Sequence, residues 1–166
     1  YILQKTMVLI ALSLATVAVC SARGAEETAM GVSVKETGDT VRVEFGGQLF
    51  TEYNFKNVDR PFFFPVIGPT GENVTRFWPV KESDEKEQKD HPHHRGLWYT
   101  HGDVNGIDFW SETKSPASPH PQIVHRKFAR LESGAQSGVI ESENQWVGKD
   151  GKPVCSDRRR HVFSIR

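Results

Sequence analysis

The segment Asp90–Trp110, DHPHHRGLWYTHGDVNGIDFW, holds more side chains suited to acid–base or metal chemistry than any other part of the chain. Four of the seven histidines fall within it, together with one arginine and three aspartates. An unpaired polar group costs about 1–3 kcal/mol to bury, so ordinary core sequence does not collect such residues. We expect the segment to line a polar cleft, to hold a metal ion, or to do both.

A strand over residues 93–101 is one way to arrange these groups. Strand geometry would place every second side chain on one face, and that face would carry His93, Arg95, Leu97, Tyr99 and His101. Histidine transfers protons near neutral pH, and arginine donates paired hydrogen bonds to neighbouring oxygens. The pattern predicts a cleft for a sugar or sugar acid. His93 and His101 are the candidate acid–base residues, and Arg95 and Tyr99 are candidate ligand-binding residues.

A site for a divalent metal ion is the alternative. His91, His93 and His94 are close enough in sequence to bind one ion, although the proline after the first restricts the backbone. His101 lies seven residues after His94, which is about 23 Å in an extended chain, so it reaches the same ion only if the chain bends back. This arrangement would make the protein a metal-dependent oxygenase or hydrolase.

Four further polar residues complete the candidate ligand-binding set: Arg76, Asp103, Asn105 and Asp108. The run Asp103–Gly106 is also typical of a tight turn, because aspartate, asparagine and glycine favour turn geometry. We therefore keep both interpretations of this run.

The other notable aromatic and histidine residues are expected to be structural. The tryptophans Trp98 and Trp110 fit the hydrophobic core best. Three histidines stand alone in the sequence and are expected to be structural or surface residues: His120, His125 and His161.

The elements that position these residues are predicted to be β-strands. Hydrophobic and polar residues alternate over much of the chain, and helical periodicity is not sustained. The expected strands form a hairpin with its turn at 37–39 and further segments at 49–55, 62–64, 122–132 and 138–147, with a turn at 149–152. The segment 62–64 is apolar throughout, as in a strand buried on both faces. We predict an all-β fold, an antiparallel β-sandwich.

The beginning of the chain has the pattern of a secretory signal peptide. A basic residue precedes the apolar run Met7–Cys20, and small residues follow it. The run is shorter than the roughly 20 residues of a membrane-spanning helix. We expect residues 1–22 to be the signal peptide, with cleavage after Ala22 or Ala25, and no membrane span in the mature chain. The protein would be periplasmic or secreted, and a lipid anchor on Cys20 is the minor alternative.

The remaining residues, 30–166, are predicted to be the N-terminal part of one β-sandwich domain that is incomplete at its C-terminus, because Val162–Arg166 has the pattern of a strand interior. The 21 basic and 21 acidic residues balance, so the sequence shows no basic surface for nucleic acid. The expected partner is a small molecule or a glycan.

Several short motifs together resemble a bacterial family of exported proteins labelled methane oxygenase PmoA. They are the segments 65–69, 74–79, 90–98 and 101–110. The resemblance implies a galactose mutarotase-like supersandwich that binds sugars on a concave sheet face, with a histidine acid opposite a glutamate base. His93 and His101 would be the candidates for that acid. An epimerase-like or lyase-like enzyme and a sugar-binding module without catalysis are both consistent with it.

Overall fold

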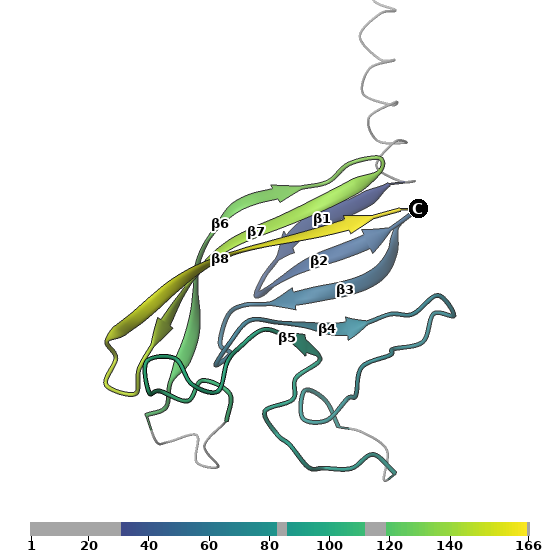
Figure 1. Ribbon diagram of the computed structural model, residues 1–166. Helices are drawn as coiled ribbons and strands as arrows, with labels where there is room; N and C mark the ends of the chain where they lie inside the picture. The colour runs from purple at the N-terminus through teal and green to yellow at the C-terminus, as the bar shows by residue number, and fades with distance from the viewer. Residues whose placement is uncertain (1–30, 83–85, 112–118, 166) are drawn as a thin grey trace, which may run out of the picture.

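The computed structural model describes residues 31–82, 86–111 and 119–165, and all regular secondary structure in these ranges is β-strand. Five strands form one antiparallel sheet in the order β1-β2-β3-β4-β5: β1 Val32–Thr37, β2 Thr40–Phe45, β3 Gln48–Asn54, β4 Phe62–Val66 and β5 Leu97–Trp98. Three longer strands form the second: β6 Gln122–Glu132, β7 Ser137–Val147 and β8 Pro153–Ser164. The two sheets lie one over the other (Figure 1). The predicted all-β antiparallel fold is confirmed, whereas its likeness to galactose mutarotase stays a prediction.

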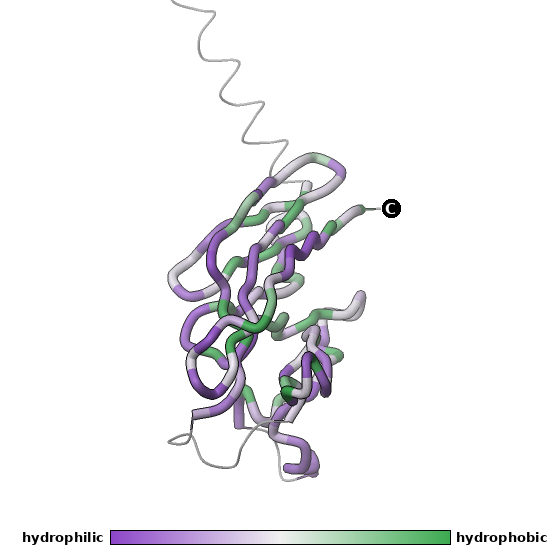
Figure 2. Tube along the Cα trace, turned by 60° about the vertical axis from the view of Figure 1, so that its left-hand side comes forward, coloured by the Kyte–Doolittle hydropathy of each residue, from purple (hydrophilic) through white to green (hydrophobic). Residues whose placement is uncertain are grey.

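Alternation of side chains explains why these segments form the two layers. Val41 and Val43 of β2 point into the core, as does Trp146 of β7, while their neighbours along each strand are more exposed. The hydropathy trace shows the same change from hydrophobic to hydrophilic along the strands (Figure 2). Burial of these alternate residues fixes which face of each strand is internal, because a slip of one residue would turn the apolar side to solvent.

The strand of consecutive phenylalanines is buried on both faces, as its composition predicted. Phe62, Phe63 and Phe64 are each at most 6% exposed. The ring of Phe63 faces the second sheet, where it packs against Phe163. The ring of Phe64 packs against Phe77 in the loop that follows β4. This loop therefore covers the outer face of β4 and is held close to the sheet.

The expected strand over residues 93–101 does not form, because only Leu97 and Trp98 pair with β4. A turn precedes them, in which the amide of His94 donates to the carbonyl oxygen of His91 at 3.0 Å. Gly96 then adopts a φ of +61°, and a Cβ at this position would lie 2.2 Å from the carbonyl oxygen of Phe63. The backbone is thus bent within residues 93–101, where the predicted strand required an extended chain.

The centre of the sandwich is Tyr53 on β3, which is 1% exposed. Its ring lies among Phe63 of its own sheet and Phe128 and His161 of the other, and its hydroxyl shares a hydrogen bond of 3.3 Å with Ser142 on β7. One side chain thereby connects the two layers through both apolar packing and a polar contact.

The predicted signal peptide at residues 1–22, its cleavage sites and the lipid anchor on Cys20 lie outside the described residues and stay predictions. Within the described ranges, no helix has the length and apolar character that crossing a membrane would require.

We predict that Tyr53→Ala lowers the free energy of unfolding by about 3–5 kcal/mol, the usual cost of removing a large aromatic ring from a core. Tyr53→Phe is the matched control. It removes only the hydroxyl, and the loss of one hydrogen bond costs about 0.5–1.5 kcal/mol. Urea unfolding followed by circular dichroism measures both changes. Equal losses for the two variants would show that the hydroxyl contact, not ring packing, connects the sheets.

Candidate functional site

Three of the four histidines in the segment come together in the loop before β5, residues 90–96, which we call the histidine loop. His91, His93 and His94 each offer a ring nitrogen, and these three atoms lie within 4.8 Å of one another. The rings of His91 and His94 are stacked, with centroids 4.8 Å apart, and His93 packs edge-on against both. The turn described above produces this convergence. It brings His91 over His94, which an extended strand would have separated.

Two tryptophans support the histidine loop. Trp98 of β5 and Trp110 pack against each other with centroids 4.7 Å apart, and both rings lie about 6 Å from the rings of His93 and His94. The expectation that both are core residues is wrong, because Trp98 is half-buried and Trp110 is 42% exposed. They form the wall of the histidine loop instead.

Arg60, which the sequence did not single out, fixes this wall. It is 2% exposed, and its Nη1 atom donates to the carbonyl oxygens of Phe109 and Trp110 at 2.8 and 2.7 Å. Its guanidinium also lies over the ring of Trp98, 5.0 Å from the centroid. Hydrogen bonds from a buried charged group are among the stronger ones in proteins. Arg60 therefore holds β5 and the segment around Trp110 together.

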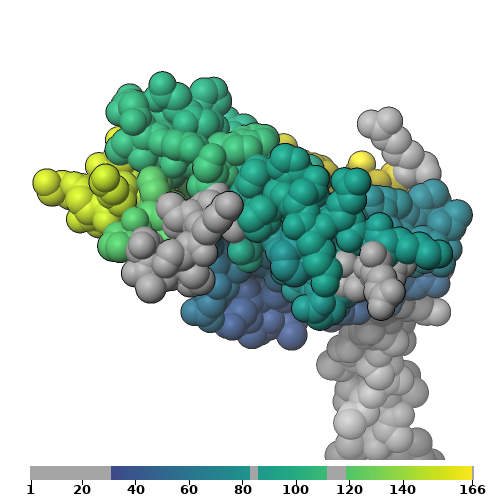
Figure 3. All heavy atoms as spheres, turned by 90° about the horizontal axis from the view of Figure 1, so that it is seen from below, coloured from purple at the N-terminus to yellow at the C-terminus, as the bar shows by residue number. Residues whose placement is uncertain are grey.

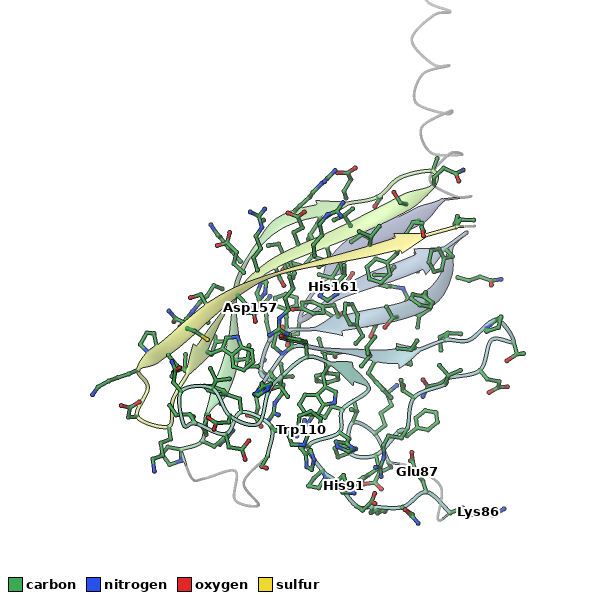
Figure 4. All side chains as sticks on the ribbon, viewed as in Figure 1. Lys86, Glu87, His91, Trp110, Asp157 and His161 are labelled. Carbon is green, nitrogen blue, oxygen red and sulfur yellow. The ribbon has the colours of Figure 1, made fainter. Side chains whose placement is uncertain are left out.

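A chain of charged groups runs from Arg76 to the first histidine. Arg76 donates to Asp90 Oδ1 at 3.0 Å and also to the carbonyl oxygen of Gln88, and Asp90 Oδ2 lies 3.5 Å from His91 Nε2. The hydrogen bond from Arg76 holds the pKa of the Asp90 carboxyl below its usual range. Arg76, predicted to bind ligand, thus orients the carboxylate beside His91. Both Asp90 and His91 are exposed, and His91 lies in the loop that precedes β5 (Figure 4).

The three imidazoles fit a transition-metal ion. Ligand atoms around a tetrahedral ion with bonds of about 2.0–2.1 Å lie about 3.4 Å apart, so small side-chain rotations would close the present spacing. Burial lowers the pKa of His94, which keeps its ring neutral and available as a ligand. A carboxylate beside a ligating histidine, as Asp90 is beside His91, is the usual support for such a ligand.

The other predicted residues after β5 form local turns. Asp103 accepts a hydrogen bond from the amide of Gly106 at 2.7 Å, and Asn105 has a φ of +55°, so the turn interpretation of Asp103–Gly106 is confirmed. His101 is exposed, and its Nδ1 atom accepts a hydrogen bond from the amide of Asp103 at 3.1 Å. The teal-to-green segment that contains them lies on the face of the molecule seen in Figure 3. Their binding of a ligand stays a prediction.

Asp108 also has a structural contact. Its Oδ1 atom accepts hydrogen bonds from the amides of Trp110 and Ser111 at 2.7 and 3.1 Å. Burial opposes ionisation of this carboxyl, but the hydrogen bonds from Ser111 and Trp110 outweigh it and lower the pKa. A role for Asp108 in binding stays a prediction, as does one for the half-buried Arg95.

Tyr99 turns away from the histidine loop toward the second sheet. Its ring lies over the guanidinium of Arg159 on β8, 5.2 Å from the centroid, and near Trp146 on β7. Arg159 is 8% exposed and forms an ion pair with Asp157 at 2.7 Å. The Asp157 carboxylate also accepts hydrogen bonds from Asn144 at 2.8 Å and from Trp146 Nε1 at 2.7 Å. A polar network, buried at Asn144 and Arg159, therefore lies on the inner face of the paired strands β7 and β8.

A cavity of about 250 Å³ lies beside this network, between β8 and the first sheet. Its walls include Tyr53, Phe63, Trp98, Tyr99, Arg159 and His161. His161, expected to be structural or on the surface, projects from β8 into this interior, where its ring lies 4.8 Å from that of Phe63 (Figure 4). Alternation in the sequence could have indicated this group of residues, because Asp157, Arg159 and His161 are every second residue of one strand and therefore share a face.

The other two isolated histidines have structural contacts, as expected. His125 packs between the rings of Phe55 and Phe128, with centroids 4.7 and 4.2 Å away. His120 lies with its Nε2 atom 2.8 Å from Asp59 Oδ1. Neither residue borders the histidine loop or the cavity beside β8.

Comparison with known proteins identifies one family. A family of unknown function, DUF6807, matches residues 40–166. No curated protein and no solved structure is detectably similar to the chain.

We predict that the interior histidines make the protein less stable in mild acid. Burial lowers the pKa of His161, and the nearby Arg159 lowers it further, against an opposing effect of Asp157. As the pH falls, the unfolded chain therefore binds a proton first, near pH 6.5. Stability is complete above that pH and decreases below it, by up to about 1.4 kcal/mol per pH unit for each such histidine.

Urea unfolding between pH 7.5 and 5, with chelator present, measures this slope. His161→Phe should reduce it, and His125, whose pKa burial also lowers, should account for part of the remainder. His101→Phe makes the same substitution at an exposed position and should leave the slope unchanged. A slope that is identical in the protein and in His161→Phe would contradict the burial argument.

Proposed function

Since the chain belongs to DUF6807, a family of unknown function, we propose its function from its own geometry: it is a metal-dependent hydrolytic enzyme. His91, His93 and His94 would bind one divalent ion. The observation that carries the proposal is the convergence of the three ring nitrogens within 4.8 Å. Three imidazoles leave the fourth position of a tetrahedral zinc ion open, where a bound water is activated near neutral pH.

The set of donors favours hydrolysis over oxygenation. Non-haem iron oxygenases use two histidines and one carboxylate on one face of the ion. Here the carboxylate beside the histidines, Asp90, is already hydrogen-bonded to Arg76, and its Oδ2 atom lies 3.5 Å from His91 Nε2. It is therefore placed to orient His91, which is the role of a carboxylate that supports a metal-binding histidine.

The surroundings of the three histidines also suit a reaction with an external substrate. His91 is exposed, and His93 and His94 are only half-buried, so the site is open to solvent. Trp98 and Trp110 provide rigid apolar walls beside it. Rigid aromatic support is what keeps ligands in place when an ion is absent, and it reduces the cost of assembling the site.

Binding of a carbohydrate is a second candidate function, and a separate observation favours it. Arg95, His93 and His101, which were expected to carry it, do not lie along one strand face. The support comes from the cavity beside β8, where aromatic side chains and the polar groups of Arg159 and His161 face the same space. Flat aromatic walls with a few polar groups are the usual composition of a small-ligand site.

We predict that the protein binds one equivalent of Zn²⁺ with a Kd of about 1 µM or tighter. Replacing any one of His91, His93 and His94 with alanine should weaken binding by more than about 100-fold, because a ligand is lost. Asp90→Asn should weaken Zn²⁺ binding by about 10–100-fold, which is the usual effect of altering a residue that supports a metal-binding side chain. Isothermal titration with Zn²⁺ measures these constants.

The matched control is His101→Ala, an exposed histidine outside the histidine loop, which should bind Zn²⁺ like the unmodified protein. Hydrolysis of an activated ester by the zinc-loaded protein should be faster than by the chelated protein and by His93→Ala. Equal Zn²⁺ affinity in His93→Ala would disprove the site. If Zn²⁺ binds tightly but the zinc-loaded protein hydrolyses the ester no faster than the chelated protein, the metal site would stand and the proposed enzymatic role would be wrong.

A further inference from the structure

The cavity beside β8 has the size of a site for one small ring. Its volume of about 250 Å³ is below the roughly 300–1,000 Å³ of pockets for drug-sized ligands. Tyr53, Phe63 and His161 lie at the buried side. Leu97 and Tyr99, which are 61% and 63% exposed, lie at the solvent side. A ligand could therefore enter past β5 without opening the sandwich.

Two polar atoms at this cavity, one on Arg159 and one on His161, have no hydrogen-bond partner in the part of the chain that the structure describes. Arg159 uses Nε and Nη2 to bind the Asp157 carboxylate, at 2.7–3.1 Å, and this leaves Nη1 without a hydrogen bond. His161 Nε2 is buried and has no hydrogen-bond partner. Buried polar atoms are nearly always paired, so the unpaired Nε2 atom of His161 beside the cavity indicates a ligand or water. These two groups would meet the same ligand.

The charges around the cavity cancel. The positive charge of Arg159 is matched by Asp157 at 2.7 Å, and burial keeps His161 neutral near pH 7 by lowering its pKa. Asp157 itself stays ionised: burial raises its pKa, but hydrogen bonds from Arg159, Asn144 and Trp146 outweigh that effect. A charged ligand would lose its hydration here without gaining an opposite charge, which is unfavourable.

We propose that this cavity binds one neutral, hydroxyl-bearing sugar ring, either a free monosaccharide or the terminal residue of a glycan. Trp98 and Tyr99 offer aromatic faces to the C–H groups of the ring. Arg159 Nη1 donates to one hydroxyl oxygen, and His161 Nε2 forms a hydrogen bond with another hydroxyl. The inference deepens the second candidate function and is independent of the metal ion, because His91, His93 and His94 do not line the cavity.

The arrangement also explains why the site is built on β8 and not on the histidine segment. The side chains of Asp157, Arg159 and His161 point from β8 toward the interior of the sandwich. This strand is regular and pairs with β7 along its length. Asn144 and Trp146 on that neighbour hold the Asp157 carboxylate in place. The donor group of Arg159 is thus fixed before the ligand arrives, which reduces the entropy lost on binding.

The test is a titration of the full chain with glucose, galactose and mannose, their methyl glycosides, short oligosaccharides and the matching uronic acids, all in EDTA. Tryptophan fluorescence and calorimetry report binding, since Trp98 lies in the wall of the cavity. We expect at least one neutral saccharide to bind, and its uronic acid to bind at least tenfold more weakly. If methyl glycosides and oligosaccharides bind as well as the free sugar, the natural ligand is the terminal residue of a glycan. If they do not bind, the natural ligand is a free monosaccharide.

Two variants locate the site. His161→Phe removes the ring nitrogens while filling the interior, and Tyr99→Ala removes an exposed aromatic wall, so each should raise Kd by about tenfold. Val162→Ala on the outer face of β8 and Phe77→Ala on another exposed surface are the matched controls and should bind like the unmodified protein. Tyr99 is on the surface, so its variant keeps the test valid if His161→Phe does not fold.

Unchanged affinity in Tyr99→Ala and His161→Phe would overturn the assignment of the cavity while leaving carbohydrate binding elsewhere intact. Binding of no saccharide would overturn both the inference and the second candidate function. Tighter binding of a uronic acid than of its neutral sugar would overturn the charge argument. Binding that appears only when the titration is repeated with Zn²⁺ in place of EDTA would assign the sugar to the metal site instead.

Discussion

The half-buried carboxylate of Asp157 is the constraint on which the polar half of this sandwich depends. A carboxylate inside a protein is unfavourable unless hydrogen bonds replace its hydration. Here Arg159, Asn144 and Trp146 do so, at 2.7–3.1 Å. The need to satisfy this group fixes the register of β7 against β8 and turns a row of polar side chains inward. Tyr99 packs on Arg159, so the segment after β5 is held by the same network.

A second constraint joins this interior to the histidine loop. Gly96 approaches the backbone of Phe63 so closely that no side chain fits, and the chain must bend there. The bend places Trp98 between two environments. Its ring lies about 6 Å from those of His93 and His94, and it also lines the cavity beside β8. Arg60 beneath it holds the carbonyl oxygens of Phe109 and Trp110. The two candidate sites therefore share one rigid wall and no polar residue.

Local patterns in the sequence predicted the strands because burial of one face is a local property. The hairpins, the doubly buried strand β4 and the turn at Asp103–Gly106 all followed from alternation or turn chemistry. The same alternation failed at residues 93–101, since the bend at Gly96 depends on the backbone of Phe63, far away in sequence. The histidine cluster was predicted by composition, but its geometry comes from that bend. The sequence could not show that Arg60 and His161 belong to the candidate sites, because their roles come from contacts between segments that are far apart in the chain.

The claim that the histidine loop binds a metal is tested most directly by the X-ray absorption spectrum of the protein loaded with one equivalent of zinc. The account predicts three imidazole nitrogens and one oxygen at about 2.0–2.1 Å from the ion. It also predicts that this pattern disappears in His94→Ala and persists in His101→Ala. A sulfur at about 2.3 Å, which would indicate the exposed Cys155, or a shell of oxygens with no imidazole would contradict it.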